Sequence, residues 1–414
     1  MGTKNIKSYV TICVLSWLVY VMAYFGRINL SIAIPWIEEE YGYSKAALGF
    51  LASGFFASYA GGQFINGLLG DRFNPRYFIS IGLLASGLGN LCFGLFPVLP
   101  VMFISWVING YFQSMLWGPL LRTVSEHVPA EQQNAAAFLM STTPSAGYYL
   151  SYTTVGKIAV LANWKAAFIV PGVLLAIMAA LWFWRLADSK NKTDIAEDRK
   201  AAGGTTGNSR SLKAGGLAYL VFIRKLSYII ILGIMAGAVK EGLTFWGPSL
   251  LADQGKTGME KALYFMSLVP LINIPFLILN GLINKTRVNP SWSIAVFALL
   301  SFAAALLLRM SVDHSFLALI LIFYLLMASI FSVSNLMTSY LPLEYRKEGR
   351  ISSVAGIIDS SFYLGAVVAG PAVGAAADHF GWPAIFTGIT AACLMAFAVS
   401  VFVLRSGRSA QSGP

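Results

Sequence analysis

The sequence predicts an all-α membrane protein with twelve transmembrane helices in two pseudo-symmetric six-helix halves, and three observations support this fold class. Hydrophobic residues make up 57% of the chain and charged residues only 11%, against roughly 25% charged residues in soluble domains. The apolar residues gather in runs that can cross a bilayer, and the two halves repeat one another. The net charge of +11 is spread over short segments without interleaved stacking aromatics, so we expect no nucleic-acid partner.

Each predicted helix is an apolar run of bilayer-crossing length. The runs are 9–36, 46–69, 77–96, 99–121, 134–160 and 164–186 in the first half, and 226–251, 260–284, 291–309, 314–340, 350–377 and 382–405 in the second. The first run is too long for a signal peptide and lacks a small-residue cleavage site. The longest polar interval is rich in Gly, Ser, Lys and Asp, as flexible linkers are. We therefore expect halves at 1–186 and 219–414, joined by a cytoplasmic linker at 187–218.

The distribution of basic residues predicts the orientation in the membrane. If both termini are cytoplasmic, 21 of the 29 Lys and Arg residues lie in cytoplasmic segments, six lie outside and two lie within spans. This asymmetry follows the positive-inside rule. We expect a multi-pass protein of the plasma membrane, or of the inner membrane if the source is bacterial. The two cations within spans are Arg27 and Lys240.

The two halves share short motifs in a common register, which is typical of an internal repeat. The pairs are Asn66-Gly67 with Asn280-Gly281 at 214 residues, Pro129-x-Glu131 with Pro342-x-Glu344 at 213, and Trp164-x-Ala-Ala-Phe with Trp382-x-Ala-Ile-Phe at 218. An offset of 213 also carries Arg27 onto Lys240. Parallel six-helix halves place such residues opposite one another across a central cavity at the membrane midplane. The two cations therefore predict an anion site.

Arg27 is the first candidate for binding an anion. At 1.5 Å per residue it lies about 16 Å along its helix from Glu38 and about 30 Å from Lys7. A charge at that depth is costly unless it faces a cavity or a protein interior. Tyr24 and Ser31 share its helix face, so a guanidinium, a phenol and a hydroxyl could serve one oxyanion. The alternative is a structural pairing of Arg27 with a neighbouring helix.

Two carboxylates lie at membrane depth in the second half. Glu241 follows Lys240 directly, and consecutive helix residues point about 100° apart, so we do not expect both to face the cavity centre. Pairing of Glu241 with a neighbouring helix is the preferred interpretation, and a coupling role is the alternative. Asp359, with Tyr363 one turn on, is either an ion partner of Lys240, a proton-coupling group, or both. Asp359 and Tyr363 are also candidate substrate-binding residues.

Further polar residues carry weaker signals. Gln113 is a candidate substrate ligand, although most intramembrane polar side chains join helices to one another. In the segment Gly67–Arg76, Asp71 can accept from the N-terminus of a neighbouring helix, and Arg72 and Arg76 fit the cytoplasmic surface. We expect this segment to act as a conformational latch. The sequence has no metal-ligand spacing, phosphate-binding loop or nucleophile–base pair, so we expect no metal, no cofactor and no enzyme.

The pattern G-x-x-x-D-R-x-N-x-R at 67–76 resembles the helix 2–3 motif of the major facilitator superfamily. The stretches "YFGRINLSIAIPWI", "GDRFNPR", "NGYFQSMLWGP", "LLRTV" and "WGPSLL" resemble the organophosphate/phosphate antiporters, which include the glycerol-phosphate and hexose-phosphate carriers. This resemblance implies that Arg27 is the substrate-phosphate arginine, and that Lys240 occupies the place of a second arginine. The glycerol-phosphate carriers have a histidine on helix five, whereas this chain has Pro144 near that place. Other organic anions are therefore credible substrates.

These observations together predict a secondary transporter of a small organic anion, a phosphate ester or related oxyanion, that works by alternating access around Arg27 and Lys240. One alternative is proton-coupled symport of a sugar acid or other carboxylate. The other is a sensor that binds the same ligand without carrying it. The expected partners are the organic anion, the lipid bilayer and a counter-substrate, either phosphate or a proton, and we expect a monomer.

Overall fold

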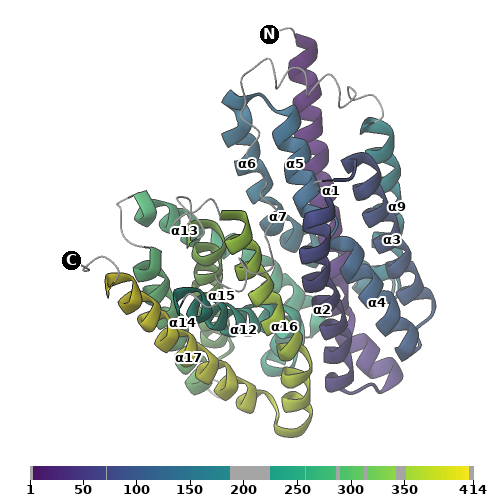
Figure 1. Cartoon of the computed structure of the whole chain (residues 1–414). Helices are drawn as coiled ribbons and strands as arrows, with labels where there is room; N and C mark the ends of the chain where they lie inside the picture. Colours follow the sequence, from purple (N-terminus) through teal and green to yellow (C-terminus); the bar gives the residue numbers. More distant parts are fainter. Residues whose placement is uncertain are drawn as a thin grey trace.

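The computed structural model describes residues 3–70, 72–186, 224–256, 258–285, 290–311, 315–341 and 351–409, and the regular structure within these ranges is helical (Figure 1). The first half contains α1 (Thr3–Tyr41), α2 (Lys45–Gly70), α3 (Pro75–Leu95), α4 (Leu99–Gln113), α5 (Trp117–His127), η1 (Ala130–Gln132), α6 (Gln133–Ser141), α7 (Thr143–Leu150), η2 (Ser151–Val155), α8 (Gly156–Leu161) and α9 (Ala166–Arg185). The second contains α12 (Arg224–Gly255), α13 (Met259–Lys285), α14 (Pro290–Ser311), α15 (Phe316–Asn335), η4 (Leu336–Tyr340), α16 (Ile351–Phe380) and α17 (Trp382–Ser409).

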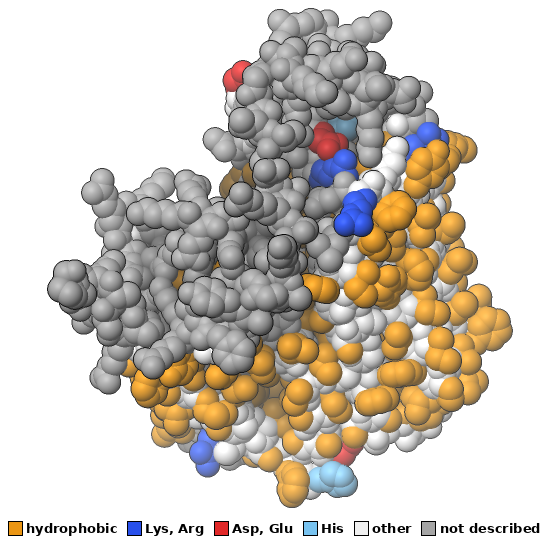
Figure 2. Space-filling view, in the orientation of Figure 1, with side chains coloured by type: hydrophobic (Ala, Val, Ile, Leu, Met, Phe, Trp, Pro, Cys, Tyr) orange, Lys and Arg blue, Asp and Glu red, His pale blue; other side chains and the backbone are white. Residues whose placement is uncertain are grey.

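These helices confirm the predicted fold class. Ten helical segments within the described ranges are long and apolar enough to cross a membrane. The two remaining predicted spans are α2, whose sequence is rich in Gly, Ala and Ser, and the interrupted segment formed by α6, α7, η2 and α8. Figure 2 shows apolar side chains over the flank of the molecule, as a lipid-facing surface requires. Leu88 and Ile104 are among the exposed apolar residues of the spans.

Irregular helix geometry is concentrated in the two segments that border the centre of the molecule. Pro144 lies at the start of α7, where a missing backbone donor is tolerated, and α7 runs into the π-helical turn η2. A second π-helical turn, η4, continues α15. Such turns are frequent at functional sites because they redirect side chains within a helix. Tyr152 in η2 and Thr338 in η4 both line the cavity described below.

The two halves contact one another closely at the end of the bundle opposite the N-terminus, here called the closed end (Figure 1). At the crossing of α2 and α16, a Cβ atom added at Gly49 would lie 2.2 Å from the carbonyl oxygen of Gly370. The side-chain hydroxyl of Ser53 donates to the carbonyl oxygen of Val367 at 2.6 Å. Because both contacts involve backbone atoms, small residues on α2 and α16 set the distance between the halves.

A carboxylate from the second half also caps a helix of the first half at the closed end. The backbone amides of Lys45 and Ala46, at the start of α2, donate to the Asp378 carboxylate at 3.2 and 2.9 Å. The first amides of a helix have no partner within the helix, so a carboxylate placed there stabilises it. Together with the close packing of Gly49 and Ser53, this cap makes the contact of α2 with α16 the principal junction between the halves.

The predicted repeat has a structural counterpart near the closed end. The indole of Trp164 donates to Glu40 at 2.6 Å, and the indole of Trp382 donates to Asp253 at 3.0 Å. Glu40 and Asp253 are 213 residues apart, the same offset that relates Arg27 to Lys240. The linker predicted at 187–218 and Asp71 of the predicted latch lie outside the described residues.

Candidate functional site

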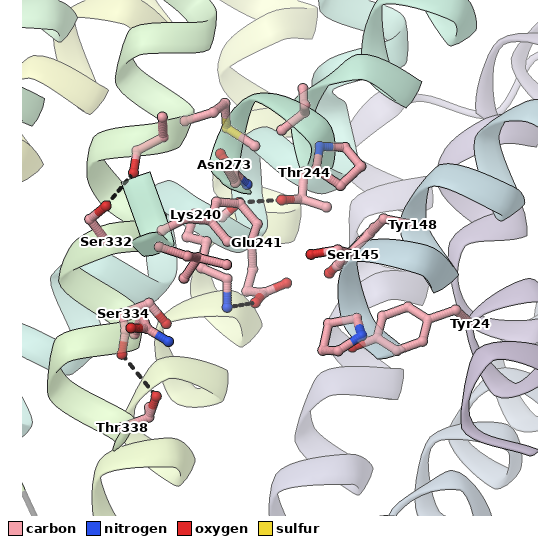
Figure 3. Close-up of a pocket in the computed structure, with 18 of the residues that line it drawn as sticks. Tyr24, Ser145, Tyr148, Lys240, Glu241, Thr244, Asn273, Ser332, Ser334 and Thr338 are labelled. Carbon is pink, nitrogen blue, oxygen red and sulfur yellow. Dashed lines mark hydrogen bonds and ion pairs between the residues drawn. The ribbon is translucent and has the colours of Figure 1, made fainter. Parts of the chain in front are cut away.

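A cavity of about 220 Å³ lies between the two halves at the centre of the bundle. The first half lines it with Tyr24, Arg27, Phe56, Ser141, Pro144, Ser145, Tyr148 and Tyr152. The second half lines it with Lys240, Glu241, Thr244, Met266, Val269, Pro270, Asn273, Leu277, Met327, Ala328, Phe331, Ser332, Ser334, Asn335, Thr338 and Tyr363. Figure 3 shows the walls facing one another, with Tyr24, Ser145 and Tyr148 opposite Lys240 and Glu241.

The cavity is closed on one side by hydrogen bonds between the halves. The hydroxyl of Ser31 donates to the carbonyl oxygen of Phe245 at 2.6 Å, and the phenol of Tyr152 donates to that of Thr244 at 3.0 Å. The cavity walls also include Ser141, the last residue of α6, and α6 lies at the end of the bundle that carries the N-terminus (Figure 1). The central cavity therefore belongs to a conformation sealed at the closed end.

Arg27 reaches the cavity with an unneutralised charge. Its Nε donates to the side-chain oxygen of Gln113 at 3.0 Å, and no carboxylate of the described residues lies within ion-pair distance. The guanidinium carbon lies 4.5 Å from the ring centroid of Tyr59 and 5.0 Å from that of Tyr24. Its Nη2 is buried without a hydrogen-bond partner among these residues. A buried donor of this kind is costly unless a ligand completes it.

Gln113 holds this guanidinium from behind. It is fully buried, does not line the cavity, and donates through Nε2 to the carbonyl oxygen of Ala23 at 3.1 Å and to the side-chain oxygen of Asn109 at 3.2 Å. Asn109 in turn donates to the carbonyl oxygen of Gly26 at 2.7 Å. Gln113 was predicted as a substrate ligand; in this conformation it lies behind the cavity lining and is hydrogen-bonded to Arg27.

Lys240 differs from Arg27 because its charge is paired. Its Nζ lies 2.8 Å from Oε1 of Glu241, and both side chains line the cavity (Figure 3). The expectation that Glu241 pairs with a neighbouring helix is therefore wrong. The Cα–Cβ bonds of the two residues diverge, but the flexible four-carbon stem of lysine lets the ammonium fold back to the adjacent carboxylate. The ammonium also lies 5.1 Å from the ring centroid of Phe331.

The two predicted residues of helix α16 have different positions. Tyr363 lines the cavity, and its ring lies 4.8 Å from that of Tyr59 on α2, so it joins the two halves. Asp359 does not line the cavity. Lys240, Glu241 and Arg27 are the charged groups that act on Asp359 electrostatically, but the ion partner of Lys240 is Glu241.

Tyr24 and Ser31, predicted to share an anion with Arg27, have different environments. Tyr24 lines the cavity beside Arg27, and its ring lies 4.9 Å from that of Tyr148. Ser31 is buried, and its hydroxyl proton is used by the carbonyl oxygen of Phe245. In this conformation Ser31 therefore serves the contact between the halves.

The predicted latch residues lie away from the cavity. Arg76 donates from Nε to the carbonyl oxygen of Phe183 at 2.8 Å, and its guanidinium carbon lies 4.0 Å from the Phe183 ring centroid, so it joins α3 to α9. Arg72 is exposed. Arg122 of α5 donates from Nη1 to the carbonyl oxygen of Gly70 at the end of α2, at 2.8 Å. Sequence reasoning did not assign a role to Arg122.

Most of the hydroxyl groups of the second-half wall were also missed. Ser332, Asn335 and Thr338 line the cavity from α15 and η4 at intervals of three residues, and Ser334 lies beside them. Sequence analysis did not single out this polar face. The regular spacing of these side chains within an apolar run was the available signal.

Comparisons with known proteins agree with this arrangement. The sequence pattern of the Major Facilitator Superfamily matches residues 16–359. The chain is 24% identical over 397 residues to a probable hexose phosphate transport protein of Chlamydia trachomatis, covering 91% of this chain and 87% of that protein. It is 26% identical over 416 residues to the glycerol-3-phosphate transporter of Bacillus subtilis, covering 95% and 91%.

The fold also matches solved structures. A bacterial homologue of the human lysosomal transporter Spinster, in an inward-facing and occupied conformation, superposes with a TM-score of 0.72 at 13% identity, covering 97% of this chain and 96% of that one. The relatives match nearly the whole chain, and both carry names of phosphate-ester transporters, as the motifs of helix one and the helix 2–3 loop suggested. The chain belongs to the Major Facilitator Superfamily and resembles its organophosphate/phosphate antiporters.

Proposed function

We propose that this protein is a secondary active transporter of a small organic anion, whose oxyanion group binds Arg27 in the central cavity. The observation that carries the proposal is the buried guanidinium of Arg27, which has a donor without a partner and no carboxylate at ion-pair distance among the described residues. A planar guanidinium binds phosphate, sulfonate or carboxylate oxygens through paired N–H donors.

The position of the cavity supports alternating access. It lies between two related halves and is sealed at one end by bonds that join those halves, so rocking of the halves would break the seal and expose the same site to the other side. The excess of basic residues in segments near the N-terminus and linker favours the cytoplasm for the open end. The described conformation is then inward-facing.

The names of the relatives favour a phosphate ester as the substrate. The resemblance to the organophosphate/phosphate antiporters favours its exchange for inorganic phosphate. Symport of a sugar acid or other carboxylate with a proton is the second candidate, favoured by the Lys240–Glu241 pair, which leaves one unneutralised cation in the cavity. A sensor would bind the same anion without transporting it. Counterflow of labelled anion into proteoliposomes separates the two transport mechanisms from a sensor.

A binding experiment tests the role of Arg27. Purified protein is screened by thermal shift against organic anions, because a ligand that binds the folded state raises its stability by mass action. Arg27→Lys removes the planar fork, and we expect affinity to fall by at least about tenfold, roughly 1.4 kcal/mol. Arg309→Lys, at an exposed position on α14, is the matched control and should bind as the wild type does. Unchanged affinity in a folded Arg27→Ala variant contradicts the proposal.

A further inference from the structure

The charges that line the cavity are unequal on its two sides. Arg27, Lys240 and Glu241 are its charged side chains among the described residues, two positive and one negative. Arg27 rests on a neutral amide and on aromatic rings, so its charge is free to meet a ligand. Lys240 is held at 2.8 Å by Glu241. The lining of the cavity therefore carries one unneutralised cation, and Asp359, which interacts electrostatically with Lys240 and Arg27, lies outside this lining.

We propose that this site selects organic anions that carry a single negative charge and a hydroxylated tail, with Glu241 as the residue that disfavours dianionic phosphate esters. The inference rests on the proposed anion site at Arg27 and assigns its substrate class. It chooses the second of the two candidate substrates, the sugar acid or other carboxylate, over the phosphate ester that the names of the relatives favour. The single charged group of the ligand binds Arg27, and its uncharged end lies against α13, α15 and η4.

The pairing of Lys240 with Glu241 is built into one helix. The two residues are neighbours on α12, and their side chains are 16% and 7% exposed. A rocking motion of the halves moves them together, so it does not separate them. A second negative charge on the ligand finds no unpaired cation in the lining. It would either face the Glu241 carboxylate or displace it from Lys240, leaving that largely buried carboxylate unpaired. Breaking a buried pair in this way is strongly unfavourable.

The wall around this pair suits an uncharged polar group. Asn273 of α13 and Asn335 of α15 offer amide donors and acceptors, and Asn273 has a buried side-chain oxygen without a hydrogen-bond partner among the described residues. Ser332 and Thr338 contribute hydroxyl groups on the same side (Figure 3). Amides and hydroxyls of this density match a ligand tail with several hydroxyl groups.

The test compares ligands that differ in charge. Thermal-shift titrations of the full-length protein at pH 7.5 use gluconate and glucuronate with one charge, and glucose 6-phosphate and glycerol 3-phosphate, whose second phosphate pKa near 6 leaves them close to two charges. Glucose is the uncharged control. We expect the wild type to bind a monoanion at least about tenfold more tightly than the dianions.

Variants of the pair change the cavity charge in opposite ways. Glu241→Gln frees Lys240, and we expect the preference to move at least about tenfold toward the dianions. The double variant Lys240→Gln/Glu241→Gln removes one charge of each sign, so it should return to the preference of the wild type. Glu260→Gln, at an exposed position at the start of α13, is the matched control for loss of a carboxylate and should keep the wild-type preference.

The outcomes separate this inference from the proposed function. Stronger Arg27-dependent binding of the dianions by the wild type overturns the single-charge rule and leaves the anion site standing. An unchanged preference in folded Glu241→Gln also overturns it. If no probe stabilises the wild type in a manner that depends on Arg27, the proposed function itself fails. The comparison of wild-type ligands needs no Glu241 variant, so it remains decisive if Glu241→Gln does not fold.

Discussion

Removal of the Asp378 carboxylate should loosen the closed end of the bundle. Asp378 of α16 accepts from the amides of Lys45 and Ala46, and these donors belong to the first turn of α2 in the other half. The cap exists only while the halves are closed at this end. The cap therefore contributes to the free-energy difference between the conformations that are closed and open at this end. A shift of their populations requires a change in that free-energy difference.

The size of the effect follows from the energetics of helix capping. Replacing an N-terminal capping residue by alanine typically costs about 1 kcal/mol. Asp378 is exposed, so salt screens its carboxylate. The interaction of that charge with the N-terminus of α2 therefore adds only a small part of the stabilisation. A loss of about 1 kcal/mol changes the ratio of closed to open molecules by about fivefold. Asp378→Asn keeps an acceptor oxygen but loses the charge, so its shift should be smaller.

Distances between spin labels can measure this shift. Leu161 ends α8 in the first half and Phe380 ends α16 in the second. They are 83% and 76% exposed, so cysteines there can carry labels. The native cysteines Cys13, Cys92 and Cys393 are replaced by serine in the background protein. We expect Asp378→Ala to raise the ratio of molecules with the longer label distance to those with the shorter one by about fivefold. An unchanged distribution, or a shift toward the shorter distance, refutes the capping argument.

Two further substitutions probe the packing and the anion site. Gly49→Ala places a Cβ 2.2 Å from the carbonyl oxygen of Gly370 and should destabilise the closed end by about 1–3 kcal/mol. A Cβ added at Gly61 on the same helix meets nothing within 4 Å, so Gly61→Ala should not destabilise the closed end. An equal loss of thermal stability in the two variants would contradict this prediction. Gln113→Glu places a carboxylate where the Oε1 atom lies 3.0 Å from Arg27 Nε, and should reduce anion affinity at least about tenfold in titration calorimetry. Retained affinity would show that the charge of Arg27 is not the main anchor.

The sequence was sufficient to predict the helices and the two deep cations because both depend on simple physical requirements. A run of apolar residues must satisfy its backbone within a helix when it crosses a bilayer, so its length alone indicates a span. Arg27 could be identified because a charge at that depth is costly unless it faces a cavity or a protein interior. The interrupted segment of α6, α7 and α8 was predicted only as one continuous run.

The partners of these residues could not be predicted in the same way. Ser31 donates to a backbone carbonyl of the other half, and every residue has such a carbonyl, so no sequence pattern marks this acceptor. Gln113 was recognised as polar and intramembrane, but its position behind Arg27 depends on how α4 packs against α1. Glu241 was misassigned because helix geometry fixes the direction of Cβ but not that of a long lysine side chain.

The two halves retain a common brace but differ in the cavity, and this difference bears on the shape of the ligand. The repeat-related bonds of Trp164 to Glu40 and of Trp382 to Asp253 hold the outer ends of the first helix of each half. The repeat-related cations have opposite environments, since Arg27 is unneutralised and Lys240 is paired. A ligand with the same group at both ends would gain equally from two equivalent cations. An unequal pair, with a wall of hydroxyls and amides beside Lys240, instead favours a ligand with one charged end and one uncharged polar end.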